Sequence, residues 1–482
     1  MTAGTEADPA EQAPSGRAPI RKALSLSALN TVIGKLGTFL TGVVLARLLT
    51  PEDFGVYAVA LVALTAVLAL NELGVSLALV RWPGDPMRIA PTVTTISLVS
   101  SGLMYLACFF GAPLFASALE APEATGVIRL LCVLVLIDGL TATPEQLVNR
   151  QFRQGVRLLV DLANLVITTG VTVGLAAAGH GPWSLAWGQL VGNVLSALVL
   201  FRLAGVWPRP GFDRRYALQL LRFGLPLAGA SLLVFGMLNI DYVVTGRVLG
   251  AAALGLYLQA FNLASWPVNV FSLVVRRVSL AAFARVQEDP AQRQATLGRM
   301  AMLLAVPTLP ACVVLGLLAL PLVTTVYGQP WAGSAAALQF LAILAAVRVF
   351  GELYYDFLVA LGKSRTTMWL QGGWLLALGA ALPVGALLGG IQGVALAHAG
   401  VALLLVLPVY TLVVTRTGIS VRVLAVSIAR PASGALAVAA VLVVLRFLLE
   451  PSWVLLVAGL GLSALVYLPF VWPLRKKLRE FG

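Results

Sequence analysis

The feature that most constrains this chain is a series of apolar segments, each about 20 residues long, with only short polar breaks between them. A membrane-spanning helix needs about 20 apolar residues, and the breaks leave room for about fourteen such helices. Numbered in chain order, the predicted segments are 24–46, 55–79, 91–113, 125–143, 158–178, 184–204, 224–247, 252–275, 299–326, 333–361, 366–388, 391–414, 424–448 and 453–473. In lipid, the backbone N–H and C=O groups of a segment must form hydrogen bonds with one another, as they do in an α-helix. We therefore predict an all-α, polytopic membrane protein.

The composition excludes a soluble protein. Of the 482 residues, 59% are hydrophobic and only 11% are charged, whereas soluble domains are about half apolar and about a quarter charged. The net charge of +13 is spread over short loops, which is not the pattern of a nucleic-acid-binding face. We expect membrane lipids around most of the chain and no nucleic-acid partner.

The positions of the 33 Lys and Arg residues predict the orientation in the membrane. Nearly all lie in the two terminal tails or in the loops after even-numbered segments. The loops after odd-numbered segments hold only Arg47, Arg129, Arg247 and Arg446, each at a helix end. Because Lys and Arg favour cytoplasmic loops, both termini are expected in the cytoplasm of a multi-pass cell (plasma or inner) membrane protein.

An internal repeat divides the chain. Residues 43–60 (VVLARLLTPEDFGVYAVA) match residues 243–260 (VVTGRVLGAAALGLYLQA) without a gap, and the matches include Arg47 with Arg247, Gly55 with Gly255 and Tyr57 with Tyr257. Six helices separate the two copies, an even number, so both copies have the same orientation. This predicts two parallel six-helix lobes related by an axis along the membrane normal, with two C-terminal helices outside the repeat.

The predicted organisation has five parts. They are a disordered cytoplasmic tail (1–22), an N-lobe (23–204), a cytoplasmic linker (205–223), a C-lobe (224–414), and two further helices with a basic cytoplasmic tail (415–482). No loop is long enough for a soluble domain. The longest cytoplasmic connection, 276–298, is either an amphipathic helix on the membrane surface or a simple connector.

The cysteines and histidines indicate no metal site and no disulfide framework. Cys108, Cys132 and Cys312 lie inside apolar segments without ligand spacing, so we interpret them as small buried hydrophobes. His180 lies in an outer turn, and His398 is the only histidine in its segment. No metal and no cofactor are expected.

Charged residues inside the segments are candidates for a function. An ionisable side chain at membrane depth costs about 2.5–3.5 kcal/mol on insertion scales, so it normally faces a bundle interior or a watery cavity. Lys35 lies midway along the first segment. It either binds an anionic substrate in a cavity or forms a structural ion pair with Glu72 or another acid, and the sequence favours neither.

Arg348, Glu352 and Asp356 follow one another at four-residue spacing on one face of the tenth segment. Their alternating charges favour a structural or gating role over a proton or sodium path.

Asp241 precedes Arg247 near the outer end of the seventh segment. For the repeat-equivalent Arg47 and Arg247, snorkelling or bonding to helix carbonyls is favoured over substrate contact. We predict no catalytic residue. The candidate substrate-binding residues are Lys35, Arg47, Glu72, Asp241, Arg247, Arg348, Glu352 and Asp356.

Five motifs resemble those of a known family. They are LARLLTPEDFGVYAVA, PEQLVNRQFRQGVRLLVDL, GHGPWSLAWGQL, LLRFGLPLAGASLL and NIDYVVTGRVLGAAALGLYLQAFNLA. Each is modestly specific alone. In order along residues 24–414, they resemble the bacterial oligosaccharide flippases, which are polysaccharide biosynthesis transporters of the multidrug/oligosaccharidyl-lipid/polysaccharide exporter superfamily.

This resemblance implies fourteen helices in two lobes and a central cavity. It also implies transport of polyprenyl-pyrophosphate-linked oligosaccharide from the inner to the outer leaflet by alternating access, for lipopolysaccharide, capsule or teichuronic-type polysaccharide. Glycosyltransferases and a polysaccharide polymerase of the same pathway would be partners. The related flippases of lipid-linked peptidoglycan precursors carry basic residues in the first helix, at a position similar to that of Lys35.

Two other functions stay open. A cation-coupled multidrug exporter of the same superfamily would rest on the acidic residues alone and would lack the motifs above. A polyprenyl-dependent membrane glycosyltransferase or polymerase needs catalytic groups on sizeable outer loops, and the outer loops here are short. We therefore expect a transporter and not an enzyme.

Overall fold

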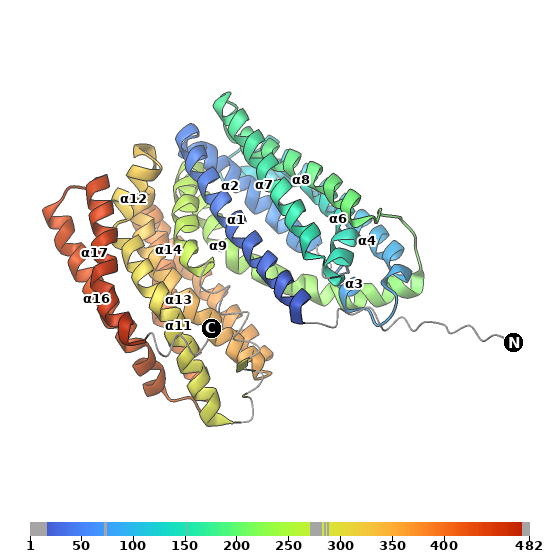
Figure 1. Ribbon diagram of the computed structural model, residues 1–482. Coiled ribbons are helices and arrows are strands. Elements are labelled where there is room, and N and C mark those ends of the chain that lie inside the picture. Colours follow the sequence, from blue (N-terminus) through green and yellow to red (C-terminus); the bar gives the residue numbers. More distant parts are fainter. Residues whose placement is uncertain are drawn as a thin grey trace.

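The computed structural model describes residues 17–71, 75–151, 153–269, 282–283, 286 and 289–474, without the side chains of residues 17–32, 223, 225–227 and 230. Within these ranges the secondary structure is helical and contains no strand (Figure 1). The predicted all-α fold is confirmed. The predicted tail 1–22 lies largely outside the described ranges, but the first helix already begins at Arg17.

The first half of the chain forms one bundle. Its helices are α1 (Arg17–Leu48), α2 (Pro51–Asn71), α3 (Ala78–Arg81), α4 (Ala90–Ala118), α5 (Ala124–Leu131), α6 (Val133–Arg150), α7 (Gln154–Ala177) and α8 (Pro182–Ala204). The start of α2 follows from its sequence: Pro51 is the first helical residue, and Thr50 and Asp53 exchange hydrogen bonds between side chains and backbone amides.

The second half begins within α9 and continues to α17. Its helices are α9 (Arg214–Pro267), α11 (Pro290–Leu317), α12 (Ala319–Val326), α13 (Ser334–Ala360), α14 (Ser364–Val401), the π-helix η5 (Ala402–Val406), α15 (Leu407–Thr415), α16 (Val421–Leu448) and α17 (Trp453–Val471). Two of these helices contain a glycine with positive φ, which only glycine adopts readily. They are α9 at Gly250 (φ 81°) and α14 at Gly390 (φ 56°), both in predicted turns.

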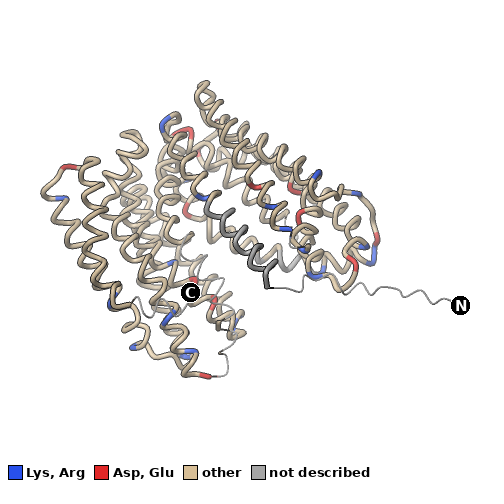
Figure 2. Tube along the Cα trace, viewed as in Figure 1, with Lys and Arg blue, Asp and Glu red and all other residues tan. Residues whose placement is uncertain are grey.

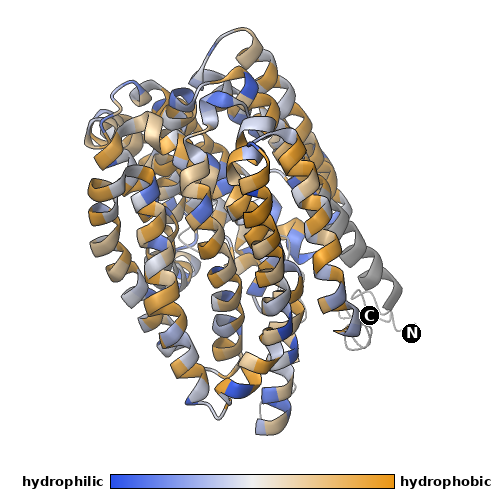
Figure 3. Cartoon of the chain, turned by 90° about the vertical axis from the view of Figure 1, so that its left-hand side faces the viewer, coloured by the Kyte–Doolittle hydropathy of each residue, from blue (hydrophilic) through white to orange (hydrophobic). Residues whose placement is uncertain are grey.

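The helices of the described residues suit a membrane. Eleven of them are long and apolar enough to cross one, and the colour of apolar residues predominates along the helices that face the viewer in Figure 3. The chain is therefore a multi-pass membrane protein. Helices α9 and α14 are each counted as one span in this total, although a glycine interrupts the helical backbone in each of them. The number of fourteen membrane-spanning helices therefore stays a prediction.

The two halves form separate bundles that meet along α2 and α9 (Figure 1). Helices α1 to α8 lie on the right of this view and α11 to α17 on the left, with the latter part of α9 between them. Figure 2 shows charged residues mainly near the helix ends and few within the spans. The linker after α8 is fixed to the first bundle, because the Gly211 amide donates to the Thr95 hydroxyl.

Several boundaries differ from prediction for local reasons. The predicted helix 125–143 consists of α5 and α6, separated at Cys132, and α11 begins at Pro290 because the Asp289 side chain caps the amides of Ala291 and Gln292. Most of the predicted surface helix or connector at 276–298 lies outside the described residues. Its part from Pro290 onward belongs to α11.

One cysteine prediction is wrong. All three cysteines are buried, as expected, but Cys108 of α4 and Cys132 form a disulfide. The spacing of these two cysteines along the chain did not indicate that they would be paired. The pair forms because α4 runs beside α5 and α6 and brings the two side chains together from facing helices.

Candidate functional site

The repeated segments contact each other at the junction of the two bundles. A Cβ atom at Gly55 of α2 would meet the carbonyl of Ala251, and one at Gly255 of α9 would meet the carbonyl of Pro51. In the repeat, Gly55 corresponds to Gly255 and Pro51 to Ala251. The contact is therefore reciprocal, as expected for two halves related by a two-fold rotation, and it requires glycine on both sides.

The two repeat-equivalent arginines strengthen this junction. The Arg47 guanidinium donates to the carbonyls of Thr325 and Val326 at the end of α12, in the other half of the chain. The Arg247 guanidinium donates to the carbonyl of Ala118 at the end of α4. Each arginine thus caps the negative end of a helix from the opposite half. The structure places them in the carbonyl-bonding role that the sequence favoured.

Trp331 completes the junction. Its indole nitrogen donates to the Ala46 carbonyl at 2.7 Å, its ring packs edge-on against Phe54 at 4.9 Å, and its side chain is fully buried. We call the set Arg47, Gly55, Arg247, Gly255 and Trp331 the outer contact, because the basic-residue pattern predicts this end of the helices to face outward.

Lys35 lies on α1, and its side chain is exposed. The opposite face of α1 packs on α7, through Gly37 against Leu165 and Thr41 against Thr169. Lys35 shares its own face with Phe39, which contacts Trp266 of α9 at 4.8 Å. It is thus turned away from its own bundle. Among the described residues no carboxylate forms an ion pair with it, and the proposed partner Glu72 lies outside them.

The structure brings Arg348, Glu352 and Asp356 of α13 together at a cavity of about 300 Å³. This cavity lies within the second half, between α13, both parts of α14 and both parts of α9. Its lining combines these charges with Phe261, Tyr355, Gln371, Trp374, His398 and Tyr410. Arg348 also lies over the ring of Phe261, 5.6 Å from its centroid. Lys35 does not line this cavity, so the predicted charges belong to separate places.

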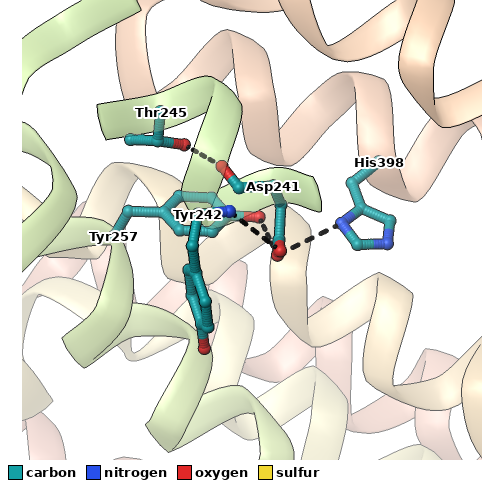
Figure 4. Close-up of polar contacts among 5 residues, drawn as sticks. All are labelled: Asp241, Tyr242, Thr245, Tyr257 and His398. Atoms are coloured by element: carbon teal, nitrogen blue, oxygen red, sulfur yellow. Dashed lines mark hydrogen bonds and ion pairs between the residues drawn. The ribbon is translucent and has the colours of Figure 1, made fainter. Parts of the chain in front are cut away.

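Asp241 lies at the centre of a buried polar cluster beside this cavity (Figure 4). Its side chain is only 1% exposed and accepts hydrogen bonds from the Tyr257 hydroxyl and the Tyr242 amide, both at 3.0 Å. The Thr245 hydroxyl donates to the Asp241 carbonyl at 2.6 Å. Asp241 is therefore a residue of the interior of the second half and not of the outer mouth.

His398 is the residue that the sequence did not identify. Its Nδ1 lies 3.6 Å from Oδ2 of Asp241, and both side chains are buried. Nδ1 has no hydrogen-bond partner among the described residues. The sequence held one signal for this site. The repeat offset of 200 residues aligns Asp241 with the neutral Thr41, so the acid is specific to the second half of the chain.

With this geometry established, the family follows from sequence comparison. A family described as "Polysaccharide biosynthesis protein" matches residues 44–336, which is more than half of the chain. The chain belongs to this polysaccharide biosynthesis family. The matched range includes residues 44–60 of the first copy of the repeat, the whole second copy, the outer contact and Asp241.

Curated relatives agree with this family. The chain is 28% identical to the succinoglycan biosynthesis transport protein ExoT of Rhizobium meliloti, over 91% of this chain and 90% of the relative. It is 25% identical to the lipopolysaccharide biosynthesis protein WzxC of Escherichia coli, over 66% and 65%. The teichuronic acid biosynthesis protein TuaB of Bacillus subtilis is 23% identical, over 64% and 65%.

Solved structures show the same fold at low sequence identity. The lipid II flippase MurJ in an inward closed conformation superposes with a TM-score of 0.77 at 14% identity, covering 95% of this chain and 100% of that one. An inward-facing multidrug resistance MATE transporter has a TM-score of 0.62 at 16% identity, over 82% and 98%. The polysaccharide biosynthesis family member described here thus has a fold found in flippases and exporters.

Proposed function

We propose that this protein is a flippase for polyprenyl-pyrophosphate-linked oligosaccharide, which it moves from the inner to the outer leaflet for cell-surface polysaccharide biosynthesis. The observation that carries the proposal is the reciprocal outer contact in a member of the polysaccharide biosynthesis family. Two halves that close on each other at the outer end through matched contacts can rock so that this end opens while the inner end closes. Such rocking is how transporters built from repeats achieve alternating access.

Lys35 fits the binding of the substrate head group. Pyrophosphate offers several acceptor oxygens, and a lysine ammonium has three donors that can reach different oxygens. The Lys35 side chain is exposed and is turned away from α7. In this proposal it offsets part of the negative charge of the head group as the sugars pass between the halves, while the lipid tail stays in the bilayer. Arg47 and Arg247 hold the outer contact closed until release.

We also propose the topology, the lobe boundaries and the partner enzymes of this flippase. Both termini face the cytoplasm, the N-lobe spans 23–204, the linker 205–223 and the C-lobe 224–414. The substrate arrives on the inner leaflet, so glycosyltransferases that act there supply it and a polymerase on the outer side consumes it. Relatives named for succinoglycan transport and for lipopolysaccharide and teichuronic acid biosynthesis support this pathway.

The test is to remove the protein from its cell and follow the lipid-linked oligosaccharides. The proposal expects complete repeat units on polyprenyl pyrophosphate to accumulate on the cytoplasmic leaflet, with loss of the surface polysaccharide, and expects the intact protein to restore both. Accumulation of incomplete repeat units would indicate an enzyme instead. Unchanged lipid-linked intermediates together with a new sensitivity to cationic drugs would favour the multidrug exporter.

A further inference from the structure

We infer that Asp241 and His398 form a proton-binding site whose occupancy controls the outer contact. The inference rests on the proposed transport function and adds to it the source of energy for the cycle. Both side chains lie inside a membrane-spanning bundle, and their exposed fractions are 1% for Asp241 and 6% for His398.

The charge balance of the pair favours one bound proton. Among the described residues, the donors that hydrogen-bond to the Asp241 side chain are neutral, namely the Tyr257 hydroxyl and the Tyr242 amide, and a buried carboxylate without a hydrogen-bonded cation is costly. The free Nδ1 of His398 lies 3.6 Å from this carboxylate. One added proton makes the pair neutral overall, either as carboxylate with imidazolium or as carboxylic acid with imidazole. Binding and release of that proton changes the buried charge by one unit.

Protons can reach the pair through the cavity. His398 lines the cavity of about 300 Å³. A cavity holds one water molecule when the space open to the centre of a water-sized sphere is about 10–15 Å³, so this cavity has room for several. Asp241 lies behind His398. Nδ1 of His398 and the indole nitrogen of Trp374, which also lines the cavity, have no hydrogen-bond partner in the described part of the chain and provide sites for such waters. His398 is thus placed between the cavity and the buried acid.

Other titratable groups contact the pair or line the cavity beside it, and they bear on any pH response. Tyr242 and Tyr257 approach from α9, and Tyr410 comes from α15. From α13 come the guanidinium of Arg348 and the carboxyls of Glu352 and Asp356. These two carboxyls line the same cavity, so an experiment must distinguish them from Asp241.

The geometry argues for a proton and against a sodium ion. Hard cations select several oxygen ligands, but among the described residues the ion-pair partner of the Asp241 carboxylate is an imidazole nitrogen. In the part of the chain that the structure describes, no group of three or more His, Cys, Asp or Glu side chains is arranged to hold a metal ion.

The pair is linked to the outer contact through Tyr257. Tyr257 donates to Asp241 and lies two residues after Gly255, where α9 meets α2. His398 lies on the part of α14 between the break at Gly390 and the π-helix η5, and both features allow this part to shift. Loss of the Asp241 charge weakens its hold on Tyr257. The proton can therefore alter the packing of α9 on α2.

The repeat provides a matched variant. Thr41 is the equivalent of Asp241 in the first half, and it holds α1 to α7 with a neutral hydrogen bond to Thr169. Asp241→Thr therefore replaces the acid by a residue that the same architecture already accommodates. His180→Gln is the control, because it removes the other of the two histidines of the chain, and His180 is exposed in the turn after α7.

The experiment uses the full-length protein in lipid nanodiscs. Spin labels on cysteines at Thr50 and Ala252, which flank the outer contact, report its opening between pH 5.5 and pH 8, in potassium or sodium chloride. We expect a pH-dependent distance distribution that is the same in both salts, kept in His180→Gln, Glu352→Gln and Asp356→Asn, and lost in Asp241→Thr, Asp241→Asn and His398→Gln. A response that survives in the Asp241 and His398 variants, or that follows sodium at constant pH, overturns the inference.

A second measurement does not depend on the folding of those variants. In His180→Gln protein labelled with ¹⁵N-histidine, the remaining histidine signals come from His398, and they should change between the neutral and the protonated pattern over the same pH range. Constant signals contradict the inference. The proposed flipping function can be refuted independently of the proton site. A normal pH response without movement of lipid-linked oligosaccharide refutes the proposed substrate but does not contradict the proton site.

Discussion

At the scale of single residues, Lys35 and Asp241 look alike in sequence, because each is a charge within an apolar segment. Their surroundings separate them. Lys35 is exposed, whereas Asp241 is 1% exposed and held by Tyr257. Which face of a helix a neighbour covers depends on tertiary packing. The sequence therefore identified both as candidates but could not assign the roles, and it missed His398, whose partner lies in a distant helix.

The Lys35 side chain gives the first prediction. We expect Lys35→Ala to lower the rate of lipid-linked oligosaccharide flipping by at least about tenfold, since a hydrogen bond to a charged group contributes about 1.5–3 kcal/mol. Lys35→Arg should retain part of the rate because it keeps the charge. Membrane insertion, measured by the amount of protein in the membrane fraction, should not change.

The control for this prediction is Lys363→Ala, since Lys363 is an exposed lysine in the loop between α13 and α14. It should flip at the wild-type rate. Wild-type flipping by Lys35→Ala would mean that the ammonium does not contact the substrate, and the residue would then have only a structural role.

At the scale of single elements, α4 shows how a membrane helix tolerates a proline. Pro113 has no amide hydrogen, so the carbonyl of Phe109, four residues earlier, loses its helical partner. Arg129 of α5 donates to this carbonyl at 3.1 Å, and its guanidinium lies 4.6 Å from the centre of the Phe109 ring. The sequence predicted Arg129 only as a charge at a helix end, because its acceptor is on another helix.

Because Arg129 bonds the carbonyl that Pro113 leaves without a helical partner, the cost of replacing Arg129 should depend on whether Pro113 is present. Arg129→Gln should lower the free energy of unfolding by about 1–3 kcal/mol, because it leaves a carbonyl without a partner in an apolar region. Pro113→Ala restores the helical hydrogen bond, so the same arginine substitution should cost clearly less in that background. Thermal unfolding of the four proteins in detergent measures the difference. Equal losses in both backgrounds would rule out the compensating bond.

The glycine contact between α2 and α9 predicts a further effect. Gly55→Ala and Gly255→Ala each place a methyl group against a backbone carbonyl of the other half, and close-packed interiors do not absorb such a clash without movement. Both should open the outer contact to a similar extent, since the contact is reciprocal. The measurement is labelling of a cysteine at Thr50 by a membrane-impermeant maleimide, which should become faster.

Gly42→Ala is the control for this contact, because a Cβ atom at Gly42 of α1 meets no other atom within 4 Å. It should leave the labelling rate of the Thr50 cysteine unchanged. If Gly55→Ala and Gly255→Ala label no faster than Gly42→Ala, the glycines do not determine how closely the halves meet.

At the scale of the whole molecule, much of the architecture could be read from periodicity. The segment 184–204 corresponds to α8 (Pro182–Ala204), the segment 453–473 to α17 (Trp453–Val471), and the predicted turns coincide with Gly250 and Gly390. Contacts across the halves could not be read, because they join segments far apart in the sequence. The disulfide and the acceptors of Arg47 and Arg247 belong to this group.

The orientation of the molecule gives a prediction of its own. In a background without the native cysteines, a cysteine at His180 should react with an impermeant reagent in intact cells, and a cysteine at Arg214 should react only after permeabilisation. Both positions are exposed on the described surface, so access to the membrane side determines the result. The reverse pattern would place the termini outside and contradict the basic-residue argument.

The central claim is that lipid-linked oligosaccharide crosses the membrane when the outer contact opens. The direct measurement uses purified protein in vesicles, with cysteines at Thr50 and Ala252 and the lipid-linked material that accumulates in cells lacking the protein. We predict transfer of this material between leaflets, loss of transfer when the two cysteines are cross-linked, and recovery when the cross-link is reduced. Transfer no faster than in protein-free vesicles, or transfer that continues at full rate in the cross-linked protein, would contradict the account.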